Sequence, residues 1–144
     1  VVTIDHGEWD MHTGLGTLRG GAMLRQAEEL ARAFAAFFDD IGPLASKVTL
    51  VTLSEFGRRV KENPNLGLDH GYGNAMFVAG AGVRGGQYYA SWPRIDDQLD
   101  ADLLVTTDYR SVLGEIVAAR FPAASLPTVF PGFTRQRVGV MLGQ

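Results

Sequence analysis

The sequence predicts an α/β domain in which helices cover a sheet, and three observations carry this prediction. Val1–Ile4 is a short apolar run rich in β-branched residues, Ala22–Ile41 repeats apolar residues at helical spacing, and Val48–Leu53 is a second β-rich run. A strand, a helix and a strand in this order form a βαβ unit. We therefore expect the two strands to be parallel and joined by a right-handed crossover.

Size and composition exclude several classes of protein. The chain has 144 residues, which suits one domain, and its 46% hydrophobic and 20% charged residues are typical of a globular protein. A net charge of −3 without a basic tract argues against nucleic acid or an anionic membrane surface as the main partner. Zero cysteines exclude disulfides and thiolate zinc sites, and no apolar run reaches the roughly 18 residues of a membrane span. Because a predicted buried strand opens the chain without an initiator Met, we expect a piece of a longer parent.

The helices and remaining strands follow from periodicity and from helix-ending residues. Apolar side chains recur along Ala22–Ile41 every three or four residues with charged residues between them, and Gly42-Pro43 ends this helix. Ala75–Ala79 and Gln87–Ser91 are expected to be two more strands around a glycine turn. Thr107 or Asp108 caps a second helix, whose apolar face holds Tyr109, Val112, Leu113, Ile116 and Val117. The proline-rich segment from Phe121 to Thr134 is expected to be extended.

The polar residues of the chain gather in loops that the predicted parallel strands would bring together. They are Asp5, His6, Asp10 and His12 after the first strand, Ser54, Glu55 and Arg58 after the second, and Asp69 and His70 further along the second loop. Parallel strands end at the same edge of a sheet, where open α/β folds place their ligand sites. We therefore expect these side chains to share one cleft.

The histidines suggest a metal site. The chain has three, and each stands beside an aspartate, in Asp5-His6, Asp10-Met11-His12 and Asp69-His70. Imidazole and carboxylate are the ligands that zinc and manganese accept where thiolate is absent. In an extended segment, the Asp-x-His spacing points both side chains the same way. The alternatives are surface residues in turns at nearby glycines, or acid–base catalysis without a metal.

Three further motifs have competing interpretations. Arg58 can clamp phosphate or sulfate oxygens, or form a salt bridge with Glu55 or Glu62. Ser54 lacks the G-x-S-x-G turn of a nucleophile and is better explained as a strand-end serine. Gly80–Gly85 matches G-x-G-x-x-G, but a strand-like segment ending in proline follows it instead of a helix, so a dinucleotide site is not expected.

The motifs resemble one protein family over most of the chain. They are Trp9-Asp10-Met11-His12, Ser54-Glu55-Phe56-Gly57-Arg58, Asp69-His70-Gly71 with Asn74, Phe77–Gly86 and Thr106–Val112. The chain resembles the domain of unknown function 1501 family, which is related to sulfatases and alkaline phosphatases. Members are similar to much longer proteins, often with a twin-arginine export signal. The resemblance thus implies the C-terminal part, residues 1–144, of a single exported bacterial domain, periplasmic or secreted.

The resemblance also implies a fold and a reaction. The fold would be a three-layer alkaline-phosphatase-like sheet with flanking helices, here a partial domain. The reaction would be hydrolysis of phosphate or sulfate esters at one or two divalent metals, zinc or manganese first and calcium as a third candidate. The first metal's ligands would be Asp10, His12 and His70, with donor atoms roughly 2.0–2.2 Å from the ion, Asp69 being a further ligand or the partner that orients an imidazole. His6 is expected outside this group.

Other parts of the expected site are incomplete in this chain. At the place of the superfamily's second-metal Asp-His-Gly the sequence has Glu55-Phe56-Gly57, where Glu55 can ligate a metal and Phe56 cannot. The nucleophile would come from the parent's N-terminal region, so the fragment alone is expected to be inactive. The leading hypothesis is a metal-dependent ester hydrolase in which Arg58 holds the equatorial oxygens of a small anionic substrate. The alternative is a degenerate, non-catalytic scaffold of the same fold that binds a metal or an anion.

Overall fold

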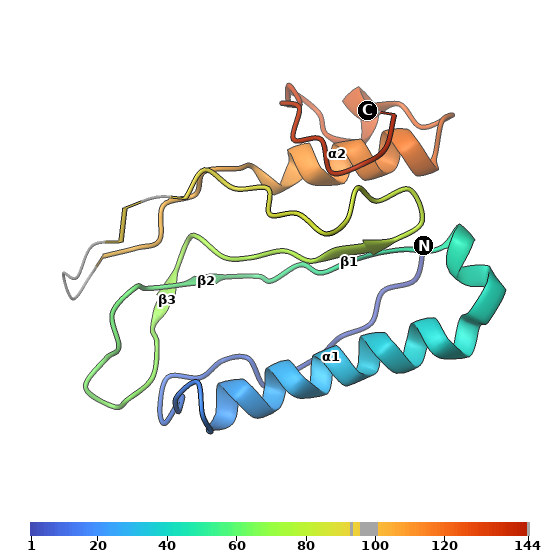
Figure 1. The fold of residues 1–144 in the computed structure, drawn as a ribbon. Coiled ribbons are helices and arrows are strands. Elements are labelled where there is room, and N and C mark those ends of the chain that lie inside the picture. Colours follow the sequence, from blue (N-terminus) through green and yellow to red (C-terminus); the bar gives the residue numbers. More distant parts are fainter. Residues whose placement is uncertain (93, 96–100, 144) are drawn as a thin grey trace. The chain divides into compact units, whose positions relative to one another are not determined.

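A computed structural model describes residues 1–92, 94–95 and 101–143. Its elements in chain order are α1 (Ala22–Ile41), η1 (Gly42–Lys47), β1 (Thr49–Val51), β2 (Gly57–Arg58), β3 (His70–Gly71), β4 (Val78–Gly80), α2 (Tyr109–Arg120) and α3 (Leu126–Val129) (Figure 1). The chain divides into two compact units. Unit 1 comprises Val1–Gly42, Phe56–Asn74 and Arg94–Leu103, and unit 2 comprises Pro43–Glu55, Ala75–Pro93 and Leu104–Gln144.

The long helix of unit 1 has the bounds that the sequence predicts. α1 ends at Gly42, whose φ of 49° lies in the left-handed region that glycine adopts without steric cost. Its exposed side carries an ion pair between Arg32 and Glu28, with nitrogen and oxygen 3.3 Å apart. Within the described part of the chain, no helix is both long and apolar enough to cross a membrane.

The strands are short and form two antiparallel pairs. β1 pairs with β4 in the register Thr49↔Gly80 to Val51↔Val78, within unit 2. β2 pairs with β3 in unit 1, with Arg58 opposite His70. This second pair matters for function because it carries a histidine and an arginine of the predicted site.

The predicted parallel βαβ unit is wrong. Val1–Ile4 forms no strand, and Val1, Val2 and Ile4 are 106%, 86% and 83% exposed. A strand needs a neighbour for its backbone hydrogen bonds, and none of the described segments pairs with these residues. The second predicted strand, Val48–Leu53, does contain β1, but its partner is the antiparallel β4. The three-layer sheet itself stays a prediction.

Two predictions for the C-terminal half are also wrong. Gln87–Ser91 is not a strand: within it Tyr89 packs against the core of unit 2, and its hydroxyl donates to the Arg84 carbonyl at 2.7 Å, whereas Tyr88 is fully exposed. The segment from Phe121 to Thr134 is not wholly extended, since it contains α3. Pro127 lies in the first turn of that helix, where a missing N–H costs no hydrogen bond.

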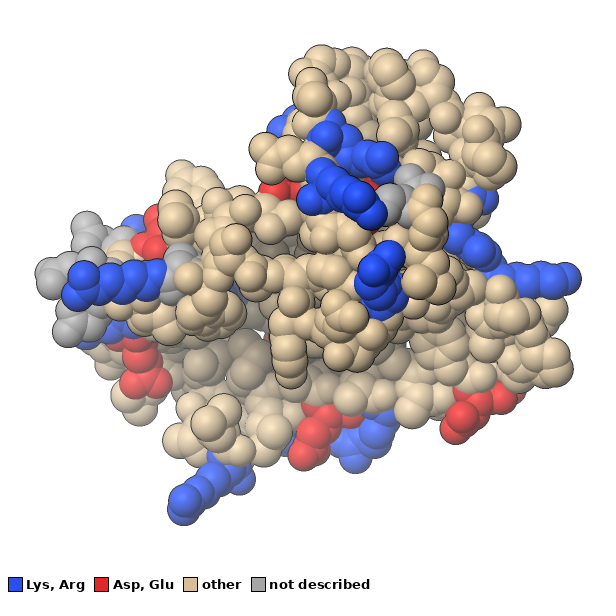
Figure 2. All heavy atoms as spheres, turned by 45° about the horizontal axis from the view of Figure 1, so that its top comes forward, with Lys and Arg blue, Asp and Glu red and all other residues tan. Residues whose placement is uncertain are grey.

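The core of unit 2 is built on α2. Asp108 caps this helix as predicted, because its side chain accepts from the Arg110 backbone N–H at 2.9 Å. Val112 and Ile116 pack with Val140 and Met141 in the buried cluster of this unit. On the face drawn in Figure 2, acidic and basic side chains are separated by wide uncharged areas.

A buried carboxylate completes the core of unit 2. Glu115 has no exposed surface, and its two oxygens accept from the backbone N–H groups of Val138, Gly139 and Val140 at 2.6 to 3.0 Å. Burial acts to raise the pKa of Glu115, but these N–H groups outweigh burial and lower the pKa below its ordinary value. The carboxylate is therefore charged and ties the C-terminal segment to α2.

Candidate metal centre

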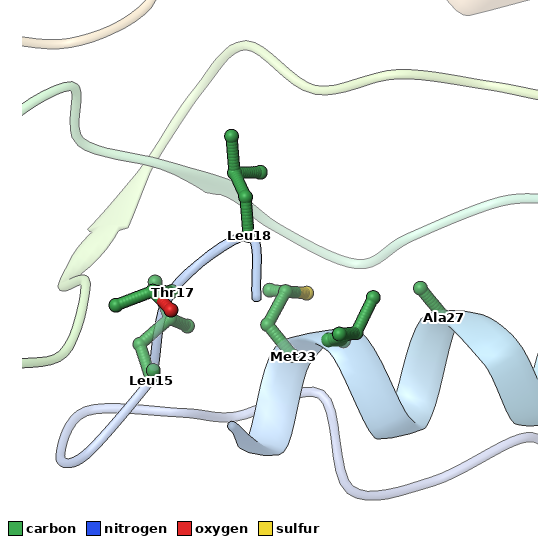
Figure 3. Close-up of a pocket in the computed structure, with 7 residues that line it drawn as sticks. Leu15, Thr17, Leu18, Met23 and Ala27 are labelled. Atoms are coloured by element: carbon green, nitrogen blue, oxygen red, sulfur yellow. The ribbon is translucent and has the colours of Figure 1, made fainter. Parts of the chain in front are cut away.

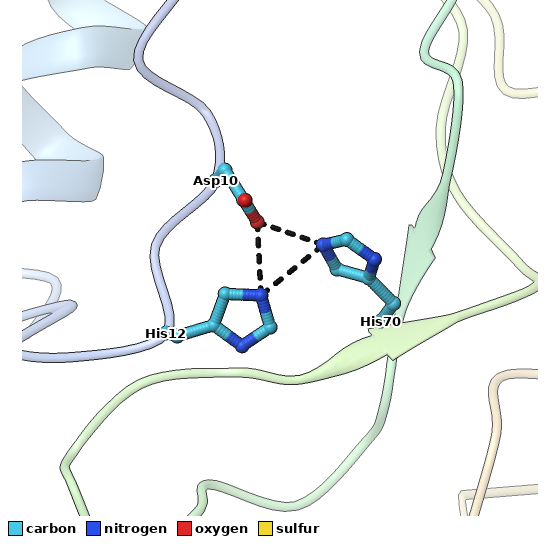
Figure 4. Close-up of side chains that lie close together, drawn as sticks. All are labelled: Asp10, His12 and His70. Atoms are coloured by element: carbon cyan, nitrogen blue, oxygen red, sulfur yellow. Dashed lines mark hydrogen bonds and ion pairs between the residues drawn. The ribbon is translucent and has the colours of Figure 1, made fainter.

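Asp10 and His12 project from a loop that is anchored between them. Met11 is buried, and its carbonyl accepts from the Leu68 N–H at 3.0 Å. With Met11 turned into the protein, its two neighbours point together into the space beside β3 (Figure 4). The Asp-x-His spacing thus has the geometric effect predicted from the sequence.

His70 comes from the paired strands β2 and β3. Its backbone lies opposite Arg58 in the ladder, and β2 packs so closely on the chain after β3 that a Cβ on Gly57 would lie 2.1 Å from the Gly73 carbonyl oxygen. This fixed backbone presents the imidazole of His70 toward the other two side chains (Figure 4).

The three side chains converge on one point. Asp10 Oδ1 lies 2.7 Å from His70 Nε2 and 3.0 Å from His12 Nε2, and the two imidazole nitrogens are 3.2 Å apart. Among the residues that the structure describes, Asp10, His12 and His70 are the group with metal-ligating atoms this close. All three belong to unit 1. We call this group the triad.

The triad has the dimensions of a metal-binding face. Donor atoms about 2.0–2.2 Å from one ion lie about 2.8–3.6 Å from each other in octahedral or tetrahedral arrangements. The separations of 2.7, 3.0 and 3.2 Å fall in or beside that range. One carboxylate and two imidazoles also match the donors that zinc and manganese prefer. The residues present therefore fit a divalent cation.

The electrostatics of the triad favour a cation as well. The hydrogen bond with His70 lowers the pKa of Asp10 below its ordinary value, and the charges of His12, His70 and Arg58 act the same way against partial desolvation. Asp10 is therefore an anionic carboxylate over the pH range in which proteins function.

Asp69 lies behind His12 instead of within the triad. Its Oδ1 is 2.7 Å from His12 Nδ1, the ring nitrogen on the other side of the imidazole from Nε2. The hydrogen bonds with His12 and then Asn63 lower the pKa of Asp69, so this carboxylate is an acceptor. A carboxylate in this position fixes the tautomer and orientation of a metal-ligating histidine. Of the two roles predicted for Asp69, this geometry matches the orienting one.

Phe56 and Arg58 lie next to the triad. The Phe56 ring stacks on the imidazole with ring centroids 3.9 Å apart, and the Arg58 guanidinium carbon lies 4.8 Å from the Phe56 centroid. The guanidinium donates to the carbonyls of Trp9 and Leu68 and lies 3.4 Å from Asp10 Oδ1. Its side chain is only 16% exposed. Arg58 thus joins both loops of the centre, and its action on an ester stays a prediction.

The remaining predicted residues lie elsewhere. Ser54 and Glu55 are exposed and belong to unit 2, so Glu55 as a metal ligand stays a prediction. His6 is outside the triad as expected: its Nδ1 accepts from Trp9 Nε1 at 2.9 Å, and Gln26 Nε2 is 3.3 Å away. Sequence reasoning missed Asn63, whose side-chain amide donates to Asp69 Oδ1 at 2.9 Å.

Unit 1 also has an open apolar depression at the start of α1 (Figure 3). Its volume is about 360 Å³, and it is lined by Leu15, Gly16, Thr17, Leu18, Met23, Leu24 and Ala27. None of these residues is titratable, so the depression offers no acid, base or metal ligand.

The motifs suggest a protein family, and a comparison with family profiles identifies it. The family profile described as a protein of unknown function, DUF1501, matches residues 1–111, most of the chain. The chain belongs to the DUF1501 family. The matched region of this DUF1501 protein contains the whole triad together with Phe56, Arg58 and Asp69. No curated protein and no solved structure matches the chain.

Proposed function

We propose that this DUF1501 protein is a metal-dependent hydrolase of phosphate or sulfate esters. The observation that carries the proposal is the convergence of Asp10, His12 and His70, whose ligating atoms all lie within 4.8 Å of one another. His12 and His70 meet there although they are 58 positions apart in the chain.

The chain's own residues supply binding and orientation. Asp10, His12 and His70 would hold zinc or manganese, and Asp69 would keep His12 turned toward the ion. The bound cation would supply Lewis-acid chemistry, polarising the ester oxygen and lowering the pKa of an oxygen nucleophile. Arg58 would meet the non-bridging oxygens of the ester. A guanidinium has five N–H donors, more than its bonds to Trp9, Leu68 and Asp10 require.

Two contacts favour a second candidate, a non-catalytic scaffold that binds a metal or an anion. The Phe56 ring covers one face of His70, where a second metal would need a polar side chain instead of a hydrocarbon. Arg58 is largely buried and holds backbone carbonyls together, as a structural arginine does. Both contacts are compatible with metal binding in the absence of hydrolysis.

Metal analysis combined with assays separates the two candidates. The full-length protein is purified, its zinc, manganese and calcium are measured, and hydrolysis of a phosphate and a sulfate monoester is followed. The hydrolase proposal predicts about one equivalent of metal and an activity that a chelator abolishes. Bound metal without turnover of either ester would favour the scaffold, and absence of binding at micromolar zinc would contradict both metal-binding readings.

A further inference from the structure

We propose that Asn63 is a positioning residue of the metal centre, which holds Asp69 and the His12 backbone so that His12 presents Nε2 to the ion. The inference rests on the proposed function, because it assigns a role relative to the metal that the triad would bind. It adds a residue that touches none of the ligating atoms and that neither the sequence motifs nor the family match assigns.

The side-chain amide of Asn63 is fully bonded. Nδ2 donates to Asp69 Oδ1 at 2.9 Å and to the His12 carbonyl at 3.0 Å. Oδ1 accepts from the backbone N–H groups of Asn65 and Gly67, both at 3.0 Å. An asparagine amide has two donor hydrogens and two acceptor lone pairs, so these four bonds use its whole capacity. Flipping the amide would set N–H against N–H, so the assignment of nitrogen and oxygen follows from the partners.

The two donated bonds act on His12 from two sides. One holds the backbone carbonyl of His12 itself, and the other holds the Asp69 oxygen that lies 2.7 Å from His12 Nδ1. A carboxylate only accepts hydrogen bonds, so Nδ1 carries a proton, and when a cation is bound Nε2 offers its lone pair to the ion. That lone pair faces Asp10 Oδ1 and His70 Nε2, where a cation would lie.

The two hydrogen bonds that Asn63 Oδ1 accepts shape the loop 63–67, which packs on the His12 backbone. Gly67 is buried, and a Cβ there would lie 2.1 Å from the His12 carbonyl carbon, so the two chains touch backbone to backbone. Gly14 N–H donates to the Asn65 carbonyl at 3.0 Å, and Leu15 N–H donates to the Leu66 carbonyl at 2.7 Å. Asn63 therefore links three parts: the loop, the His12 backbone and the carboxylate that orients the ring.

Two substitutions at this position separate orientation from folding. Asn63→Ala removes all four bonds. Asn63→Asp keeps oxygens that can accept from the Asn65 and Gly67 N–H groups, but it cannot donate to Asp69. Asn65→Ala is the matched control, because Asn65 is exposed in the same loop and the bonds described for it are those of its backbone.

The experiment uses the full chain and zinc as the probe. Zinc affinity is measured by competition with a chromophoric chelator, the His12 tautomer by long-range ¹H–¹⁵N NMR of metal-free protein, and folding by thermal unfolding. We expect both Asn63 variants to bind zinc about 10–100-fold more weakly, the usual effect of removing a group that orients a ligand. We also expect the protonated-Nδ1 form of His12 to lose population in both variants, and Asn65→Ala to match the wild type.

The outcomes separate this inference from the proposed function. Folded Asn63 variants with wild-type zinc affinity would overturn the inference alone. A weaker affinity with the His12 tautomer unchanged would also overturn it, because Asn63 would then serve only the fold. If the wild type binds no zinc, the proposed function fails. The tautomer of His12 in the metal-free variants then still decides whether Asn63 positions the ring.

Discussion

Phe56 lies flat on His70, with ring centroids 3.9 Å apart and ring planes inclined by only 13°. This contact leaves the edge of the imidazole, with Nε2, directed at Asp10 and restricts rotation of the ring. The Arg58 guanidinium carbon also lies 4.8 Å from the centroid of the Phe56 ring, so Phe56 contacts both a cation and an imidazole. The Phe56 side chain therefore limits the orientations that the His70 ring can take.

Removing the Phe56 ring should weaken metal binding. Phe56→Leu keeps an apolar side chain but loses the flat face, so His70 gains rotational freedom that a bound ion must restrict. We expect zinc affinity to fall about 10-fold, the lower end of effects seen for residues that orient ligands. Isothermal titration measures it. Phe56→Tyr retains the ring and should bind zinc as the wild type does; equal losses in both variants would contradict the stacking argument.

The triad itself makes the strongest prediction. His12→Ala in the full-length protein removes one of three ligands and should abolish stoichiometric zinc binding together with any esterase activity. The helical circular-dichroism signal should stay intact, because His12 lies in a loop. Elemental analysis after dialysis measures the metal content.

His6→Ala is the control for that variant. His6 lies in the same N-terminal loop, but its ring bonds to Trp9 and Gln26 instead of the triad. Its removal should leave the zinc stoichiometry unchanged. Wild-type metal content in His12→Ala, or equal loss in His6→Ala, would show that the triad is not the binding site.

The sequence predicts the helix bounds and caps of this protein better than it predicts which strands pair. The bounds of α1 and the Asp108 cap of α2 follow from periodicity and side-chain chemistry within a few residues, and the structure confirms both. Val1–Ile4 has every local property of a strand, yet a strand forms only where another segment offers its backbone. The β-propensity of Val1–Ile4 therefore identifies an apolar segment, but it does not show whether another segment pairs with it.

The sequence predicts that the residues of the candidate site converge, but the reason that it gives for the convergence is wrong. The expected reason for convergence was a shared edge of parallel strands, but loops 10–12 and 63–70 meet through backbone hydrogen bonds and the antiparallel β2–β3 pair. The residue types indicated three histidine–aspartate pairs, and the family resemblance selected Asp10, His12 and His70 among them. Asn63 could not be found this way, because its bond to the His12 carbonyl joins residues 51 positions apart, whose meeting the sequence does not show.

In unit 2, Glu115 should make folding sensitive to acid. Glu115→Gln replaces one accepting oxygen by an NH₂ group that faces backbone N–H groups, leaving buried donors without acceptors. We expect a loss of about 2–4 kcal/mol in the free energy of unfolding, measured by urea denaturation at pH 7. The exposed Glu28→Gln, which breaks only a surface ion pair, should cost less than about 1 kcal/mol.

The pH dependence of this difference has a definite sign. The pKa of Glu115 is lower in the folded than in the unfolded chain, where it is near the ordinary 4.5. Its contribution is therefore complete above that ordinary value and is lost as the pH falls through the folded-state pKa. The gap in stability between wild type and Glu115→Gln should narrow on acidification below pH 4.5. A gap that stays constant or widens would contradict the charged assignment.

The role of Arg58 can be read from a substitution that keeps its charge. Arg58→Lys leaves a positive group near Asp10, but a single ammonium cannot reach the Trp9 and Leu68 carbonyls in the planar arrangement of a guanidinium. If Arg58 joins the two loops, the variant should lose about 1–3 kcal/mol of stability and bind zinc more weakly, because two half-buried carbonyls lose their donors. Thermal unfolding and zinc titration of the full-length protein measure both effects.

If Arg58 serves only to hold an ester, the stability and the zinc affinity of Arg58→Lys should be those of the wild type, and only KM should rise. Because Arg58 is 16% exposed and bonded to both loops, we expect the first result. Arg59→Lys, which changes the neighbouring arginine while its backbone bond to Asp69 remains, should leave all three measurements unchanged.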